Sequence, residues 1–322
     1  MVEAGALLLL AALAAPYALP LERVSPAAAG AVWLAVLALR ALIVLGLALS
    51  ALLLLPATHL FHRVTDWSGY EIIGSLHLDL SGESIAHGAA LGPAALLVLS
   101  LLVFAVTLAR GAVTLQGELR RRALGRGPLG SVVIADQSLV VAVPGVGRAR
   151  IILSAPVLAE LDEDELETCL AHEAAHLRRR HRLFGLLAAS LAVVARPIPG
   201  AGGAERGLRL SLERDADEYA VDRTGAPLAL ASAICKLAGA PATAFARGPL
   251  AFGLDGARAA RARLDGLMAG GRSRERAGLE RAAVILAVCL SLLVAGSAVA
   301  LALWLAATTP PAALTAAVTC SG

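Results

Sequence analysis

The sequence is poor in aromatic residues and in charge, which make up 3% and 16% of its 322 residues. With 58% hydrophobic residues and a mean hydropathy of +0.74, this scarcity of charge excludes a purely water-soluble globule. Cysteine is also scarce, and the four cysteines lie in unlike settings, so no disulfide framework is predicted. The 31 glycines follow no period of three, which excludes a collagen-like chain. What is present is a chain rich in Ala, Leu and Val, with long apolar runs.

Four apolar segments meet or approach the roughly 20 residues that cross a bilayer; they are residues 4–20, 28–56, 88–109 and 282–307. The first is short, but Met1-Val2-Glu3 lacks the basic residues of a signal peptide, so we interpret it as a span. The second contains Arg40, which lies at the edge of the span if the span is counted as 41–61, and otherwise pairs within the helix bundle. We predict a mainly α membrane protein with about four transmembrane helices.

Charge is concentrated between Arg110 and Arg281, which enclose 25 of the 28 basic and 19 of the 25 acidic residues. Arginines follow the third apolar segment and precede the fourth, which places this block in the cytoplasm by the positive-inside rule. We therefore expect a multi-pass protein of the inner (plasma) membrane. Its predicted parts are a membrane region (1–110) with an extracytoplasmic loop at about 57–87, a cytoplasmic domain (111–281), a fourth transmembrane helix (282–307) and a short extracytoplasmic tail (308–322).

The predicted outer loop holds four of the seven histidines, namely His59, His62, His77 and His87. A solvated loop with scattered polar residues is the expected structure, and a pH or metal sensor is the alternative.

Within the polar block, residues 131–143 and 148–153 are rich in Val and Ile and are separated by Pro144-Gly145-Val146-Gly147, which predicts a β-hairpin. The acidic stretch 158–167 that follows is typical of a helix start. Residues 183–194 form an apolar run too short to span, so we expect a buried or interfacial helix.

The sequence His172-Glu173-Ala-Ala-His176 carries the chemistry of the block. On a helix, His172 and His176 share one face, so both imidazoles can reach one metal ion. Glu173 projects about 100° around from His172, which suits a general base acting on a water held by the metal. The motif predicts a zinc site with Glu173 as the catalytic residue.

A catalytic zinc ion needs a third protein ligand. The metzincin spacing fails, because Arg179 and Arg182 occupy the positions of its Gly and His. His181 is no substitute, because nine residues after His172 it points about 180° away on the same helix. Glu213, in an amphipathic stretch downstream, is the candidate, and Asp217 one turn later is placed to accept the free ring N–H of a liganding histidine.

These motifs, together with Ala142-Val-Pro-Gly145, Arg150-Ile-Ile-Leu-Ser154 and Glu213-x-x-Ala-Asp217, resemble the gluzincin integral-membrane metallopeptidases over about residues 130–225. Two related groups share the pattern: the HtpX and CAAX prenyl protease group, and the BlaR/MecR-type signal-transducing peptidases. The resemblance implies a small α+β zincin-like catalytic block, built of the β-hairpin, the HExxH helix and the Glu-bearing helix, that binds one Zn²⁺ and hydrolyses peptide bonds. An exposed edge of the hairpin would take up substrate in extended form.

Three apolar segments precede the motif and one follows it, an order more like the BlaR/MecR type. The resemblance then implies signal transduction by cleavage of a cytosolic transcriptional repressor. Only 15 residues follow the last segment, so we do not expect direct covalent sensing of β-lactams. An HtpX-like quality-control or CAAX-type protease is the first alternative, and a non-enzymatic receptor with a structural metal site is the second.

Other expectations concern partners and neighbouring residues. The substrate is a protein or peptide, and the basic excess suits contact with membrane lipid. No nucleic acid is expected, because arginines are not interleaved with aromatics.

Three residues near the second motif, Tyr219, Arg214 and Arg223, are open candidates for oxyanion stabilisation. Cys169 is expected to be a buried, inert residue rather than a ligand. The oligomeric state is left open.

Overall fold

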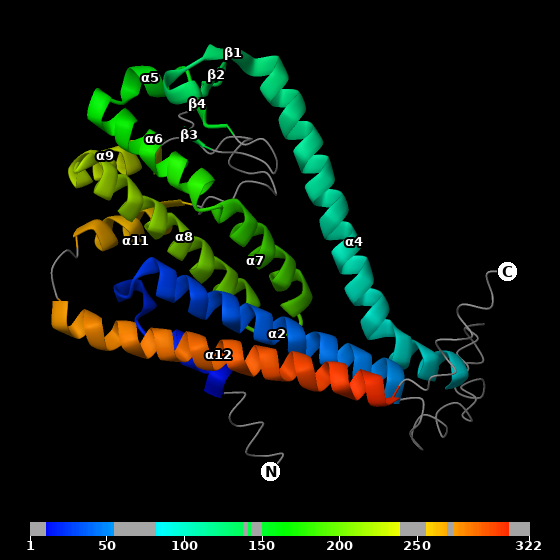
Figure 1. Cartoon of the computed structure of the whole chain (residues 1–322). Coiled ribbons are helices and arrows are strands. Elements are labelled where there is room, and N and C mark those ends of the chain that lie inside the picture. Colours follow the sequence, from blue (N-terminus) through cyan, green and yellow to red (C-terminus); the bar gives the residue numbers. More distant parts are fainter. Residues whose placement is uncertain are drawn as a thin grey trace.

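The computed structural model describes residues 11–54, 82–137, 141–142, 150–238, 256–268 and 273–308. The elements in chain order are η1 (Leu21–Arg23), α2 (Pro26–Leu54), α4 (Gly82–Arg122), β1 (Ala123–Arg126), η4 (Pro128–Gly130), β2 (Val132–Ile134), β3 (Val141–Ala142), β4 (Ile152–Ser154), α5 (Val157–Glu160), α6 (Glu163–Arg178), α7 (His181–Ala195), α8 (Ala201–Thr224), α9 (Pro227–Ala238), α11 (Gly256–Met268) and α12 (Ser273–Thr308). The small sheet, α5 and α6 lie at one end, and α2 and α12 at the other (Figure 1). The predicted fold class, a mainly α membrane protein with a small catalytic block, is confirmed.

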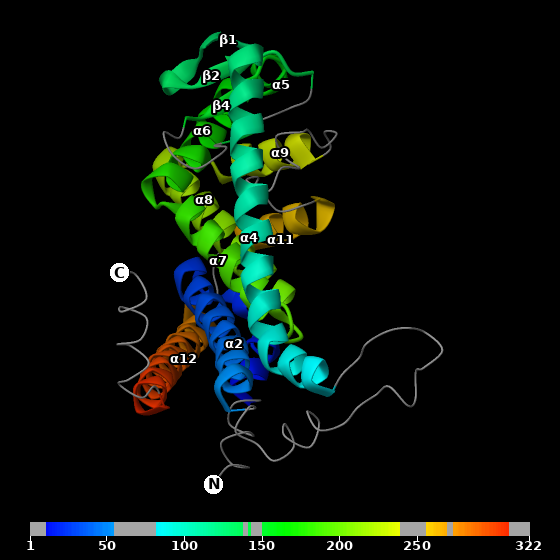
Figure 2. The same ribbon diagram turned by 90° about the vertical axis from the view of Figure 1, so that its right-hand side faces the viewer.

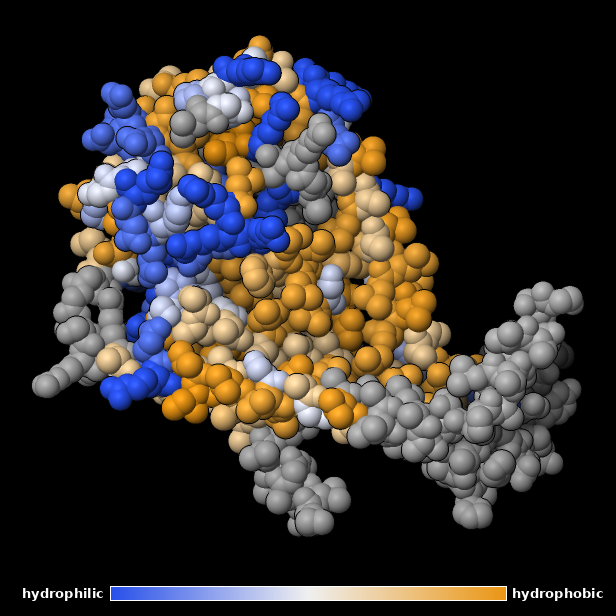
Figure 3. All heavy atoms as spheres, in the orientation of Figure 1, coloured by the Kyte–Doolittle hydropathy of each residue, from blue (hydrophilic) through white to orange (hydrophobic). Residues whose placement is uncertain are grey.

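Three of the four predicted spans are helices long and apolar enough to cross a membrane: Pro26–Leu53, His87–Arg122 and Ala277–Ser297. Of the first predicted span, residues 11–18 are helical and residues 4–10 lie outside the described part, as do His59, His62 and His77 of the predicted outer loop. The most apolar window of α4 is only 6% buried, so this helix offers a nearly continuous apolar surface of the kind that faces lipid. Figure 3 shows apolar side chains covering the lower part of the molecule and hydrophilic ones gathered over the upper left.

Helix α2 is the centre of the membrane core. Its buried residues Val32, Val36 and Leu37 pack in one cluster with residues of α7, α8 and α12. α2 and α12 run side by side in the same direction (Figures 1 and 2). Ser25, just before α2, joins the two helices, since its backbone N–H donates to Oε2 of Glu280, two turns into α12, at 3.0 Å.

Arg40 is buried halfway along α2, so the sequence alternative of pairing within the bundle is the one observed. Its guanidinium donates to the carbonyl oxygens of Leu13 at 3.1 Å and Pro199 at 3.4 Å, and it lies over the ring of Tyr17. Pro199 lies in the turn between α7 and α8, so its carbonyl is outside a helix and the apolar interior would otherwise leave it unsatisfied. Gly200, with φ 91°, fits here because a Cβ would lie 3.0 Å from both the Arg40 and Tyr17 side chains.

The apolar run after the metal helix is α7, a helix too short to span, as predicted. It descends along α2, turns at Gly200, and returns as α8 toward the sheet. Helix α8 therefore contacts the membrane core with one part and the catalytic block with another.

The sheet has the order β1-β2-β4-β3. β3 and β4 form the antiparallel pair that the hairpin prediction required, with Val141 opposite Leu153. β2, however, belongs to the same predicted strand as β3 and instead pairs parallel to β4. The prediction of one long strand over residues 131–143 was wrong, because the chain leaves the sheet after Ile134. The two parts, β2 and β3, are separate strands that both pair with β4.

The close packing of α8 on α2 can be tested by substitution of a glycine. At Gly207 a Cβ would clash with the Trp33 ring, whereas at Gly202 it would meet only the flexible Arg206 side chain at 3.4 Å. We expect Gly207→Ala to lower the free energy of unfolding by about 1–3 kcal/mol through overpacking, and Gly202→Ala to leave it unchanged or raise it. Thermal unfolding in detergent measures both, and equal stability of the two variants would contradict the packing argument.

Candidate metal centre

Helix α6 presents the two histidines of the motif. Asp162 caps its first turn, since its side chain accepts from the Glu165 N–H at 2.8 Å while the Glu165 carboxylate accepts from the Asp162 N–H. Glu165 is buried and also accepts a hydrogen bond from Lys236 at 2.7 Å, which joins α6 to α9. The helix is thereby fixed at its start, three turns before His176.

The side chains of His172, His176 and Glu213 converge from α6 and α8. His172 Nε2 lies 3.1 Å from His176 Nε2 and 3.4 Å from Glu213 Oε2, and His176 Nε2 lies 3.7 Å from Glu213 Oε1. Ligand atoms about 2.0–2.2 Å from one tetrahedral zinc ion are roughly 3.3–3.5 Å apart. The three residues therefore fit a single metal ion.

Asp217 fixes the orientation and the tautomer of the His172 ring. Its Oδ1 lies 2.9 Å from His172 Nδ1, so we assign the ring proton to Nδ1 and a lone pair to Nε2. That lone pair faces the Nε2 of His176 and the carboxylate of Glu213, so the arrangement needs a proton or a metal ion between these atoms.

Arg263, on α11, was missed by the sequence analysis. Its Nη2 donates to Asp217 Oδ1 at 2.6 Å and its Nε donates to Oδ2 at 2.8 Å, a bidentate pair, and its Nη1 lies 3.5 Å from Glu213 Oε2. Burial lowers the pKa of Arg263, but the bond to Asp217 and the nearby carboxylates outweigh this and raise it above its usual value. The guanidinium thus stays charged beside the ligand cluster.

The electrostatics of the two histidines differ. Burial lowers the pKa of His172, but the hydrogen bonds with Asp217 and Glu213 outweigh burial and raise the pKa to about 9. Burial lowers the pKa of His176 to about 3, with further repulsion from His172. Burial raises the pKa of Glu213, but the positive charge of neighbouring groups holds it below the usual value. Without a metal, a proton on His172 therefore balances the Glu213 carboxylate.

Glu173 is buried beside His172. Its negative charge helps to raise the pKa of Arg263, and it adds to the burial that raises the pKa of Cys169 to about 12. Cys169 packs in an apolar cluster with Leu153 and Leu170, and it does not belong to the metal-ligand group found in the described residues.

The structure corrects the expectation for His181. Helix α6 ends at Arg178, and Arg180 adopts a left-handed conformation (φ 55°), so His181 begins a new helix rather than continuing the old one. His181 Nδ1 lies 3.0 Å from His176 Nδ1, and its Nε2 lies 2.8 Å from Asp215 Oδ2. The prediction that His181 points away was wrong because it assumed an unbroken helix.

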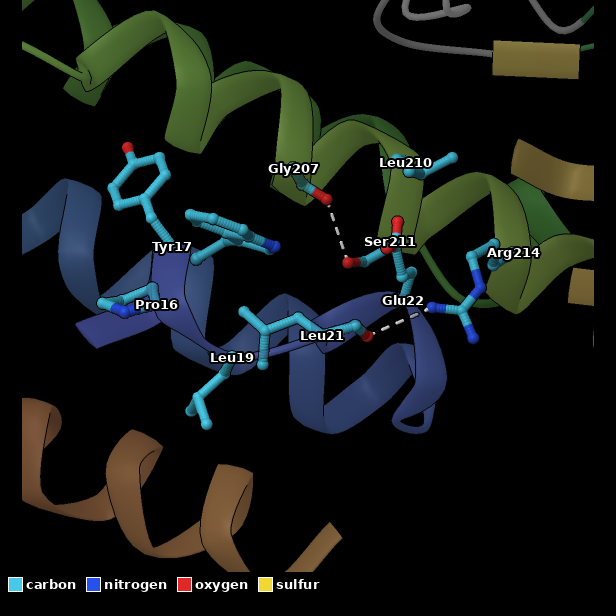
Figure 4. A pocket seen from close by; sticks show the side chains of 10 residues that line it. Pro16, Tyr17, Leu19, Leu21, Glu22, Gly207, Leu210, Ser211 and Arg214 are labelled. Atoms are coloured by element: carbon cyan, nitrogen blue, oxygen red, sulfur yellow. Dashed lines mark hydrogen bonds between the residues drawn. The ribbon is translucent and has the colours of Figure 1, made fainter. Parts of the chain in front are cut away.

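Arg214 is directed away from the ligand cluster. It donates to the carbonyl oxygens of Leu21 at 3.4 Å and Val24 at 3.0 Å, which ties α8 to the segment before α2 (Figure 4). It also borders a cavity of about 220 Å³ that contains none of the metal-ligand candidates; the lining is Pro16, Tyr17, Leu19, Leu21, Glu22, Trp33, Gly207, Leu210, Ser211 and Arg214. The cavity is therefore separate from the metal centre.

The other two candidates for oxyanion stabilisation also have different surroundings. Tyr219 accepts a hydrogen bond from Arg178 at 3.1 Å, and Arg223 is exposed near the end of α8. The arginine that the structure brings to the cluster is Arg263.

Comparison with known proteins gives one family. Residues 130–251 match the family model described as peptidase family M48. This range includes α6, α7 and α8 and ends before α11, so Arg263 lies outside it. No curated protein and no solved structure gave a match.

The raised pKa of His172 predicts how metal binding depends on pH. Below about pH 9 the metal-free site holds a proton on His172 that zinc must displace, whereas His176 is already neutral. We expect zinc affinity to rise about tenfold per pH unit as the pH rises toward 9, with one proton released per ion. Chelator competition at several pH values and calorimetry in two buffers would measure this. Below the pH at which a zinc-bound water ionises, about 7, a release of two protons, or of none, would contradict the assignment.

Proposed function

We propose that the chain, whose residues 130–251 match the model of peptidase family M48 in agreement with the resemblance to the gluzincin membrane peptidases, is a zinc-dependent endopeptidase with one Zn²⁺ held by His172, His176 and Glu213. The observation that carries the proposal is the convergence of these three ligands at zinc-like spacing in a buried site. The three described helices that are long and apolar enough to cross a membrane support the assignment of this activity to a membrane protein.

The mechanism follows from the positions of the side chains. When bound, zinc supplies Lewis acidity toward the scissile carbonyl and lowers the pKa of its water. Glu173 takes the proton of the attacking water and passes it to the leaving amine. Asp217 accepts the Nδ1–H of His172 and keeps Nε2 available for the metal, while Arg263 holds Asp217 in place.

Substrate binding is proposed at the sheet edge. β3 is an edge strand in the order β1-β2-β4-β3, and it contacts α6, the helix that bears the motif. A peptide added to this edge in extended form would pass beside the histidines. The substrate is thus a protein or peptide segment that can become extended.

We place the peptidase domain, residues 111–281, in the cytoplasm of a multi-pass inner-membrane protein. Arg120, Arg121 and Arg122 end α4, and Arg274, Arg276 and Arg281 lie in the first turns of α12, so both helices carry their positive charge at the end that joins this domain. Residues 1–110 then form the membrane region with the outer loop at 57–87, residues 282–307 the last span, and residues 308–322 an outer tail.

Substitutions at the site separate catalysis from metal binding. We expect Glu173→Ala to abolish turnover and retain one zinc ion per chain, because Glu173 is not a ligand. His172→Ala, His176→Ala and Glu213→Ala are each expected to lose zinc. Zinc content and peptidase assays on the purified protein measure both effects. Glu218→Ala, an exposed acid on the same helix as Glu213, is the matched control and should retain zinc and activity. Full turnover by Glu173→Ala would show that the base is assigned wrongly.

The biological role is proposed as signal transduction by cleavage of a cytosolic regulator, of the repressor type. A proteome-wide survey of new protein N-termini in cells expressing the wild type or Glu173→Ala, under several envelope stresses, tests this role. New termini in one or two cytosolic regulators are the expected result. Scattered termini in membrane proteins would favour quality control instead, and none under any stress would contradict the peptidase proposal.

A further inference from the structure

His181 lies between a metal-ligand candidate and a carboxylate. It is 4% exposed, with its Nδ1 3.0 Å from His176 Nδ1 and its Nε2 2.8 Å from Asp215 Oδ2. Asp215 is in turn held by Arg179, whose Nη1 donates both to its carboxylate and to its backbone carbonyl. These four side chains form one continuous chain of hydrogen bonds that ends at the ring of His176.

The geometry fixes the protons along this chain. His176 faces Glu213 and His172 with its Nε2, so a metal ion takes that nitrogen and the ring proton sits on Nδ1. That N–H donates to Nδ1 of His181, which must then carry its own proton on Nε2 and donate it to Asp215. Every donor has an acceptor in this scheme, whereas a proton on His181 Nδ1 would oppose the proton on His176.

The position of Asp215 explains why an imidazole is needed between the two groups. Asp215 and Asp217 are two residues apart on α8, so they project about 200° from one another. Asp217 reaches His172 directly at 2.9 Å. Asp215 lies on another side of α8 and contacts His181 instead.

The backbone also points to this role. Arg180, with φ 55°, is the one non-glycine residue with a positive φ in the described part of the chain. This left-handed residue separates α6 from α7 and turns His181 back onto His176, and a non-glycine residue adopts it only when its surroundings enforce it.

We propose that His181, oriented by Asp215, is a positioning residue that fixes the ring and the tautomer of His176 for metal binding. This inference rests on the proposed zinc site and adds residues to it. His181 is not itself a ligand, since its Nδ1 is directed to the side of His176 opposite the metal. The site then holds its two histidines by different means: His172 by a carboxylate, and His176 by a carboxylate acting through an imidazole.

Zinc affinity of the full-length protein in detergent, measured by chelator competition, tests the proposal. We expect His181→Ala to weaken zinc binding by about 10–100-fold, the range found when partners of liganding histidines are removed. His181→Asn retains an acceptor near His176 and is expected to restore part of the loss. Asp215→Asn should weaken binding by less than His181→Ala. Thermal unfolding of the metal-free variants verifies that they are folded.

A double-mutant cycle distinguishes this relay from a general structural effect. Because His181 and Asp215 act through one chain, the losses from His181→Ala and Asp215→Asn should be less than additive. His181→Ala and Asp217→Asn act on different histidines, so their losses should add. Additive losses in the first pair would overturn the relay.

The wild-type protein supplies a test that needs no variant at His181. With ¹⁵N-labelled histidine and bound zinc, we expect His181 to be protonated at Nε2 and His176 at Nδ1. A proton on His181 Nδ1, or a zinc affinity of His181→Ala equal to that of the wild type, would overturn the proposal. So would loss of zinc as complete as in His176→Ala, which would make His181 a ligand. A wild-type protein that binds no zinc would instead contradict the proposed function itself.

Discussion

The structure depends on how α8 is held between α2 and α6. On one side Gly207 brings the α8 backbone against the ring of Trp33, so the two helices approach more closely than any other residue would allow. On the other side α8 carries Glu213 and Asp217 to the histidines of α6. One helix thus links the membrane core to the metal centre.

The ligand cluster needs positive charge between its side chains. Glu213 and Asp217 are buried carboxylates that Arg263 contacts, and the raised pKa of His172 lets this ring carry a proton when no metal is bound. A divalent ion would take the place of that proton, which agrees with the spacing of the ligands. Arg263 lies on α11, outside the range matched to the family, so a segment beyond this range completes the electrostatics.

Local periodicity explains what could be predicted from the sequence. His172 and His176 are one helical turn apart, as are Glu213 and Asp217, so their shared faces follow from helix geometry alone. His181 could not be placed in this way, because a single left-handed residue, Arg180, reverses the direction that an unbroken helix predicts. Arg263 is 46 residues from Asp217 in the sequence and pairs with it only through tertiary packing. The same holds for the parallel pairing of β2 with β4, since residues 132–134 and 141–142 carry one continuous β pattern.

The buried Arg40 is best understood through the turn between α7 and α8. It lies 14 residues into α2, about 21 Å along that helix, so the turn that it binds through Pro199 is deep within the apolar layer. A turn exposes backbone carbonyls, which lipid cannot satisfy. Arg40 supplies the donor there, and Tyr17 donates to Gly200 at 2.7 Å. Arg214 ties the middle of the same helix to Leu21 and Val24, next to the start of α2. With both points fixed, Glu213 is held at one level relative to the first span, and the metal centre therefore lies where the apolar part of α2 begins.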